Sequence, residues 1–201
     1  YQPAPMYTAD VSVSGGTTGV RYYLSGGALS QDGLRMGSSY KKVYGRINLD
    51  ANLAEWVKAN VNTQVSYDDT QVSPFGSNNA VGGGLAAMNA PFASPYDPNT
   101  GLELERVPLL DLSTPKHVIS TNPAKTNAFI LSANGSLTLT PIKNLTIRSL
   151  AGLELNYGDS RSRTLPSYYR AYGNGSSQRA YSMASNVTLT NTVAYNMGFD
   201  D

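Results

Sequence analysis

Side chains alternate with a period of two over most of this chain, and no other feature limits its possible folds so strongly. Hydrophobic residues hold every second position, and polar residues stand between them. Seven segments show the pattern: 10–15, 20–29, 43–51, 57–68, 129–140, 145–157 and 186–196. The composition agrees, because the 14 tyrosines belong to a residue type that favours pleated structure. The sequence therefore predicts an all-β, antiparallel meander of long strands.

Charge is segregated between the two faces of these segments. The apolar faces carry no charged residue within the segment bounds. The opposite faces carry Asp10, Arg21, Arg46, Asp50, Lys58, Asp68, Arg148 and Glu154. A soluble sheet with one buried face has the same alternation, so the period alone does not separate a membrane barrel from a sandwich.

The links between the segments alternate in length, and this favours the barrel. Short links at 15–19, 52–56 and 141–144 contain turn residues, whereas the links at 30–42, 70–127 and 158–185 are long. Outer-membrane barrels have short periplasmic turns and long extracellular loops. The segment lengths mostly reach the roughly 9–11 residues that a tilted membrane strand needs. Aromatic residues lie toward both ends, with Tyr22 and Trp56 by short turns and Tyr67, Phe129 and Tyr157 toward long loops.

Composition excludes several classes of function. Charged residues make up 14% of the 201 residues and the formal net charge is +1, which argues against nucleic acid as a partner. The chain has no cysteine and one histidine, so disulfides, thiolate catalysis and a His-rich metal site are excluded. No apolar run reaches the roughly 18 residues of a membrane-spanning helix. No signal peptide opens the sequence, and we therefore expect it to be part of a larger protein.

The two longest links are the candidates for ligand or partner contact. Their tyrosines and arginines are typical of recognition surfaces, and tyrosine also stacks on sugar rings. The contact candidates are Tyr96, Tyr168, Tyr169, Arg170 and Tyr172. The alternative is a solvated loop stabilised by its own contacts. A helical turn is conceivable at 85–88, and 94–101 carries a strong tandem turn signal.

No constellation of catalytic or metal-ligating residues stands out. His117 has no Asp or Ser arrangement typical of a catalytic triad. The oxygen-rich stretch 97–103 lacks the EF-hand pattern, so an Asp-Pro turn is favoured over a calcium site. The glycines at 82–84 have no Gly-Lys-Ser/Thr ending, which excludes a phosphate loop. We expect no enzyme activity, no metal and no cofactor.

An ordered set of short motifs resembles a known family. The motifs are 11–16 (VSVSGG), 21–27 (RYYLSGG), 31–33 (QDG), 44–50 (YGRINLD), 55–58 (EWVK), 144–148 (NLTIR) and 191–195 (NTVAY), with Ala90-Pro91 and Pro95-Tyr96-Asp97 in the long loop. Together they resemble the SusC/RagA-type TonB-linked outer-membrane proteins. No single motif is strong, but the order is specific and covers most of the chain.

The resemblance implies a closed barrel of about 22 strands with an internal plug, located in the bacterial outer membrane. It implies import of a glycan or peptide, with a SusD-like surface lipoprotein over the mouth and TonB supplying energy. Seven strands do not close a single-chain barrel. We therefore expect residues 1–201 to be one barrel segment, about a fifth of a transporter, with extracellular loops at 70–127 and 158–185.

The barrel hypothesis assigns the two faces. The lumen-facing candidates are Arg46, Asp50, Lys58, Arg148 and Glu154. We expect them to line a channel, to bond to the plug or to pair with each other. Mutual pairing is slightly favoured. The lipid-facing candidates are Val61, Val65, Leu137, Leu139, Leu153 and Leu155. The alternative is a soluble, secreted β-sandwich that binds carbohydrate or acts as an adhesin, in which Val61, Leu137 and Leu153 meet across a core. A β-rich hydrolase is disfavoured.

Overall fold

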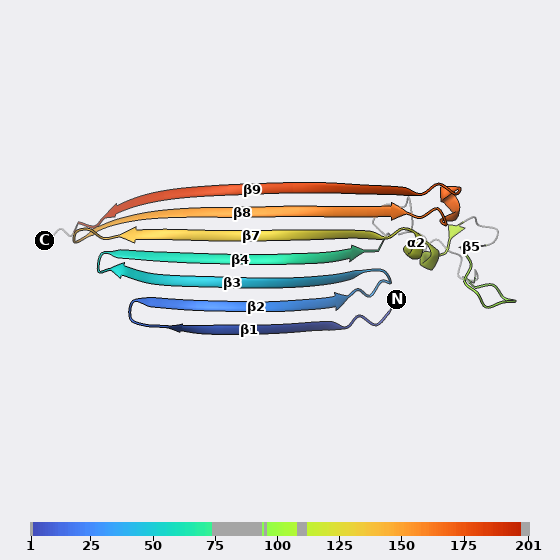
Figure 1. The fold of residues 1–201 in the computed structure, drawn as a ribbon, viewed down its shortest axis with the longest axis horizontal. Coiled ribbons are helices and arrows are strands. Elements are labelled where there is room, and N and C mark those ends of the chain that lie inside the picture. Colours follow the sequence, from blue (N-terminus) through green and yellow to red (C-terminus); the bar gives the residue numbers. More distant parts are fainter. Residues whose placement is uncertain (1, 74–93, 95, 108–111, 198–201) are drawn as a thin grey trace.

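The computed structural model describes residues 2–73, 94, 96–107 and 112–197, and within them the chain forms one long antiparallel sheet (Figure 1). Seven strands follow the order β1-β2-β3-β4-β7-β8-β9, so each long strand pairs with its neighbour in sequence. Their bounds are β1 Met6–Gly16, β2 Val20–Asp32, β3 Ser39–Ala54, β4 Val57–Val72, β7 Ala124–Leu139, β8 Leu145–Thr164 and β9 Ser176–Tyr195. The predicted fold class is confirmed.

The sheet is a single layer, and no second sheet covers it among the described residues. Val61, Leu137 and Leu153 are exposed by 43%, 39% and 39%. A sandwich requires these three side chains to meet across a core. Their exposure contradicts the sandwich alternative, and it leaves an apolar surface for which the described chain supplies no cover.

The three short turns join strands at one end of the sheet (Figure 1). Between β1 and β2, the N–H of Thr17 donates to the carbonyl of Val20 over 2.7 Å. Between β7 and β8, Asn144 adopts φ 69°, a left-handed conformation that asparagine tolerates better than most residues. The turn between β3 and β4 follows a register shift at Asn52/Ala54 and exposes Trp56 by 52%.

The strands are longer than the sequence predicted, and most of the extra length lies toward the long loops. β8 continues to Thr164 and β9 begins at Ser176, so much of the predicted loop 158–185 is paired strand. β3 begins at Ser39, which shortens the predicted link 30–42 to residues 33–38. The prediction placed the strand ends where the apolar alternation stops, but backbone pairing requires no apolar side chain.

The segment between β4 and β7 leaves the sheet and returns to it. Its described part contains the two-residue strands β5 (Arg106–Val107) and β6 (Leu112–Ser113) and the helix α2 (Pro115–Thr121). Thr114 caps α2 by accepting a hydrogen bond from the N–H of His117, with Pro115 at the first position of the helix. The 3-10 helix η1 (Tyr169–Ala171) lies between β8 and β9. The helical turn considered at 85–88 falls outside the described residues.

Among the described residues, no helix is long and apolar enough to cross a membrane.

Candidate functional site

The apolar face of the sheet is continuous from strand to strand, because the register aligns the apolar positions. One row runs across Leu49, Val61, Gly135, Ala151 and Leu189, and the next runs across Ile47, Thr63, Ala133, Leu153 and Val187. All six residues predicted to face lipid lie on this face, since successive side chains of a strand point to opposite sides. Leu139 and Leu155 are half-buried, and Val65 is exposed by 37%.

An aromatic row closes the apolar face toward the long loops. Tyr67 pairs with Phe129, Phe129 pairs with Tyr157, and Tyr157 pairs with Met183. These aromatic residues come from three different strands, yet they lie side by side at one level of the sheet. Such rows mark the boundary between hydrocarbon and headgroups in outer-membrane barrels.

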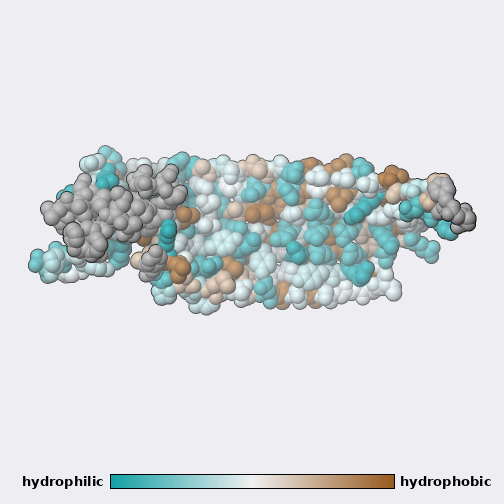
Figure 2. All heavy atoms as spheres, turned by 180° about the vertical axis from the view of Figure 1, so that it is seen from behind, coloured by the Kyte–Doolittle hydropathy of each residue, from teal (hydrophilic) through white to brown (hydrophobic). Residues whose placement is uncertain are grey.

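The opposite, polar face carries hydrogen bonds between side chains of different strands. Tyr44 donates its hydroxyl to Asp10, and Arg46 donates from Nη2 to Oε1 of Gln64 over 3.0 Å. Asp10, Tyr44, Arg46 and Gln64 line a shallow hollow together with Tyr23. Figure 2 looks onto a face of the sheet on which hydrophilic residues predominate over the strands.

The five lumen-facing candidates all lie on the polar face, but they do not pair with each other. Asp50 accepts a hydrogen bond from Nδ2 of Asn60 at 2.5 Å, and Arg46 bonds to Gln64. Lys58 and Arg148 share a row with Thr138 between them, and Glu154 lies between Ser132 and Asn186. Within the described residues no ion pair joins any two of the five, so the expectation of mutual pairing is wrong. Register explains this, because it places none of the five directly opposite another of the five. Asp50 lies between Arg21 on β2 and Asn60 on β4.

The loop candidates fall into two groups. Tyr168 is only 7% exposed, and its hydroxyl accepts a hydrogen bond from Ser113 over 3.2 Å. The ring centroids of Tyr168 and Tyr169 lie 5.5 Å apart, and that of His117 lies 5.8 Å from Tyr168. Arg170 donates from Nε to the hydroxyl of Tyr169 over 2.7 Å. This cluster joins the loop after β8 to α2, and Tyr168 serves it as a packing residue.

Tyr96 and Tyr172 are exposed, unlike Tyr168. Tyr172 is 86% exposed and holds a left-handed backbone conformation at φ 49°. Tyr96 is 49% exposed and forms an isolated bridge with Glu103. Within the predicted turn segment 94–101, residues 97–100 form a turn, in which Oδ1 of Asp97 accepts hydrogen bonds from the N–H groups of Asn99 and Thr100. That carboxylate oxygen caps its own turn, as an Asp-Pro turn requires.

Two further observations bear on the chemistry of the loops. Lys116 bonds to Glu103 over 2.8 Å, and this hydrogen bond raises the pKa of the lysine above its ordinary value. Nε2 of His117 is buried and has no hydrogen-bond partner within the described part of the chain, where the rings of Tyr168 and Tyr169 lie beside it. Across the described ranges, no group of three or more His, Cys, Asp or Glu could hold a metal ion.

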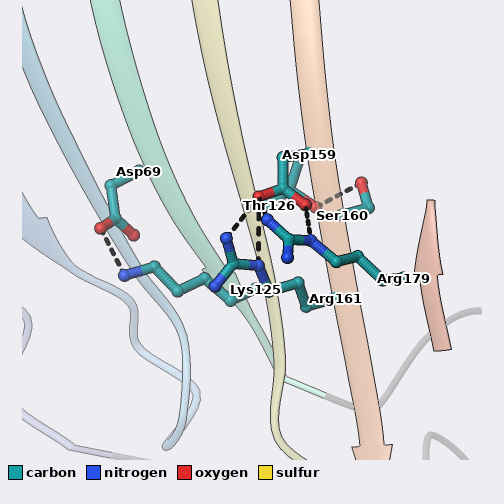
Figure 3. Close-up of polar contacts among 7 residues, drawn as sticks. All are labelled: Asp69, Lys125, Thr126, Asp159, Ser160, Arg161 and Arg179. Carbon is teal, nitrogen blue, oxygen red and sulfur yellow. Dashed lines mark hydrogen bonds and ion pairs between the residues drawn. The ribbon is translucent and has the colours of Figure 1, made fainter. Parts of the chain in front are cut away.

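The sequence reasoning missed a set of charges on the apolar face beyond the aromatic row. Asp69, Asn127, Asp159 and Tyr181 form the next row, and Gln71, Lys125, Arg161 and Arg179 form the one after it. We call Asp69, Lys125, Asp159, Arg161 and Arg179 the charged rim (Figure 3). The signal was present in the sequence, because these residues continue the parity of Tyr67, Phe129 and Tyr157. The prediction did not include them, because it ended the strand before Asp69 and placed Lys125, Asp159, Arg161 and Arg179 in loops.

Comparison with known proteins places this sheet in context. Over a stretch of 79 residues, the chain is 38% identical to the TonB-dependent receptor P26 of Formosa agariphila. That stretch is 39% of this chain and 8% of the receptor. It also superposes on a solved chain of the RagAB peptide transporter with a TM-score of 0.85 and 24% sequence identity, over 98% of this chain and 23% of the other. The predicted resemblance to SusC/RagA-type TonB-linked proteins is confirmed. No family model matches the chain.

The same fold is found in two further states of RagAB. The TM-score is 0.84 for the peptide importer in its closed-closed state and 0.82 in its open-open state, both at 24% identity. The chain spans less than a quarter of each solved chain and less than a tenth of the curated receptor. The likeness to RagAB therefore describes the architecture of this sheet, which is that of a segment of outer-membrane barrel wall.

Proposed function

We propose that this sheet forms part of the wall of an outer-membrane, TonB-dependent nutrient importer. The observation that carries the proposal is the exposed apolar face, which ends at the aligned row of Tyr67, Phe129 and Tyr157. An uncovered apolar surface of this extent on a single-layer sheet needs a lipid or protein cover. A lipid bilayer fits it, because the strands exceed the length that a tilted crossing needs.

In this proposal the polar face lines the lumen. Arg46, Asp50, Lys58, Arg148 and Glu154 then contact water, the plug or passing substrate. Their lack of mutual ion pairs supports the proposal, because these charged groups keep hydrogen-bonding capacity for other partners. No catalytic step is assigned to any residue.

The substrate is proposed to be a peptide or an oligosaccharide, with a SusD-like lipoprotein over the extracellular mouth. The likeness to the RagAB peptide importer favours a peptide. The exposed side chains of Tyr172 and Tyr96 are suited to contact the substrate or the lipoprotein, since aromatic residues recur at such contacts. Coupling to TonB would depend on other parts of an importer of this kind.

Uptake by cells tests this function. Cells that make the protein are given a fluorescent oligopeptide mixture or a fluorescent oligosaccharide mixture, with and without an uncoupler of the proton gradient. We expect uptake of one class to depend on both the protein and the gradient. Equal uptake by cells that lack the protein, for both classes, would contradict the proposal.

The exposed loop tyrosines provide a second readout. Tyr172→Ala is expected to weaken copurification of the lipoprotein, or to raise the substrate concentration needed for half-maximal uptake, without loss of folded protein. Tyr168→Phe is the matched control, because that ring is buried and keeps its packing. A Tyr172→Ala variant with unchanged lipoprotein binding and uptake would remove this residue from the proposed contact surface.

A further inference from the structure

The charged rim lies on the face that carries the apolar band, two and four residues beyond the aromatic row. Asp159 and Arg161 follow Tyr157 on β8, and Asp69 follows Tyr67 on β4. At about 3.4 Å per residue, the rows lie roughly 7 and 14 Å past the aromatic rings along the strands. If the apolar band is in hydrocarbon, as the proposed function states, the rim lies at the depth of the outer-leaflet headgroups.

One carboxylate organises the two arginines of the rim. Asp159 accepts hydrogen bonds from Nη2 of Arg161 over 2.6 Å and from Nε and Nη2 of Arg179, both over 2.9 Å. The Asp159 side chain is only 9% exposed, whereas Arg161 and Arg179 are 45% and 47% exposed. The buried acid therefore fixes both guanidinium groups, while about half of each arginine side chain stays open to solvent (Figure 3).

Both arginines keep donors for another acceptor. A guanidinium group has five N–H donors, and within the described residues the contacts of each arginine engage only its Nε and Nη2. Arg179 also stacks on Tyr181, with its Cζ 4.6 Å from the ring centroid, and this limits the orientations of the guanidinium. The two groups are thus held side by side on neighbouring strands, since Arg161 pairs with Arg179 in register.

The charge of this region is unbalanced. Beyond the aromatic row, the apolar face of β4, β7, β8 and β9 carries four cationic side chains, Lys125, Arg161, Arg163 and Arg179. The same area holds two carboxylates, Asp69 and Asp159, and Lys125 binds Asp69 over 2.6 Å. The surplus favours an anion with several acceptor oxygens, and phosphate is the headgroup chemistry that matches paired guanidinium groups.

We infer that the charged rim binds the phosphate of an outer-leaflet lipid headgroup, with Arg161 and Arg179 as the donors. The apolar band below the aromatic row then receives the acyl chains of the same lipid. The site differs from the polar face, because the rim and the polar face lie on opposite sides of the sheet. Lipid bound here fastens the long-loop end of β8 and β9 at a fixed depth in the membrane.

Binding of a defined lipid tests the inference. The probe is lipid A with one phosphate, titrated onto the protein in neutral detergent and counted by native mass spectrometry. Lipid A without the phosphate and inorganic phosphate alone are the comparison ligands. We expect tight binding of the phosphorylated lipid only. Equal binding of the dephosphorylated lipid would overturn the role of phosphate, and binding of inorganic phosphate alone with equal affinity would overturn the role of the lipid.

The variants locate the site. The triple variant Asp159→Asn/Arg161→Gln/Arg179→Gln removes the donors without leaving an unpaired carboxylate, and affinity should fall about tenfold or more. Lys143→Gln, in the turn at the opposite end of the sheet, makes the same type of change and should bind as the unmodified protein does. If the triple variant does not fold, Lys125→Gln/Arg163→Gln lowers the cationic surplus and keeps the Asp159 cluster. Unchanged affinity in the folded variants would contradict the inference.

Failure of the headgroup site can be distinguished from failure of the proposed function. Protection of Leu153→Cys from water-soluble reagents reports whether the apolar face meets lipid at all. If that residue is protected and the triple variant binds lipid A normally, only the headgroup site is wrong. If that residue reacts freely, the membrane orientation itself is wrong.

Discussion

Tyr157 and Asp159 lie two residues apart on the same face of β8, and between them the surface changes from aromatic to charged. Tyr157 is 41% exposed, while Asp159 is held by two arginines and is 7% exposed. Their common face follows from the two-residue repeat of a strand. The strand crosses this change without interruption, and β8 and β9 stay paired from Leu145 and Tyr195 to Thr164 and Ser176.

Leu153→Arg should destabilise the folded protein in lipid vesicles. Leu153 lies on the apolar band, and a cation near the middle of a lipid-facing strand costs about 2–4 kcal/mol. Asn156→Arg is the matched control, because it introduces the same side chain on the polar face of β8. Urea unfolding in vesicles measures both variants, and equal destabilisation by the two substitutions would argue against the assignment of faces.

Gly27→Ala should disturb the pairing of β2 with β3, whereas Gly26→Ala should be tolerated. A Cβ at Gly27 would lie about 2.6 Å from the ring of Tyr44, its direct partner on β3, and would also meet Asp10. At Gly26 the nearest atom is the carbonyl oxygen of Tyr44 at 3.5 Å, an ordinary contact. Overpacking costs about 1–3 kcal/mol, so unfolding should separate the neighbouring variants. Equal stability would show that Tyr44 can move aside freely.

Asp159→Asn should loosen the long-loop end of β8 and β9. The substitution leaves Arg161 and Arg179 as directly paired like charges, an arrangement that destabilises a sheet. Amide hydrogen exchange should accelerate in residues 176–183 and stay unchanged in 186–195. Adding Arg179→Gln to this variant should restore much of the protection. No restoration would mean that charge repulsion is not the cause.

Thr114→Ala should destabilise α2 and leave the sheet intact. Thr114 is fully buried, caps the helix and donates from its hydroxyl to the carbonyl of Leu104 over 2.7 Å. Loss of a helix cap costs about 0.5–2 kcal/mol. Ser120→Ala removes an exposed hydroxyl from the same helix and should have a smaller effect. Limited proteolysis should cleave the Thr114→Ala variant faster near α2, and equal cleavage of both variants would contradict the role of the cap.

The alternation of apolar and polar residues was sufficient to predict the sheet, its seven long strands and the membership of its two faces. It did not predict where the strands end, because residues such as Arg161 and Arg179 pair through their backbones without continuing the apolar pattern. The sequence also gave no sign that Tyr168 is buried. That burial depends on Ser113 and His117, which the fold brings close from a distant part of the chain.

The charges of the polar face illustrate a second limit. The strand pattern placed Arg46, Asp50, Lys58, Arg148 and Glu154 on one face, but pairing depends on register across strands. Register puts Arg46 opposite Gln64, and it puts Asp50 between Arg21 and Asn60. The side-chain hydrogen bonds of Arg46 and Asp50 join them to the amides of Gln64 and Asn60. Periodicity within one strand fixes which face each residue joins, but which residue lies opposite on the next strand depends also on the geometry of the turn between them.

The central claim is that one face of this sheet meets lipid and the other meets water. The chain has no cysteine, so single cysteines can be introduced at the consecutive residues Leu153 and Glu154 without background. Outer-membrane vesicles that contain each variant are permeabilised, so that a water-soluble maleimide reaches both sides of the membrane. The maleimide itself does not enter the lipid interior. The account predicts that Glu154→Cys reacts and Leu153→Cys is protected until detergent denatures the protein. Rapid labelling of Leu153→Cys, or equal labelling of both residues, would contradict it.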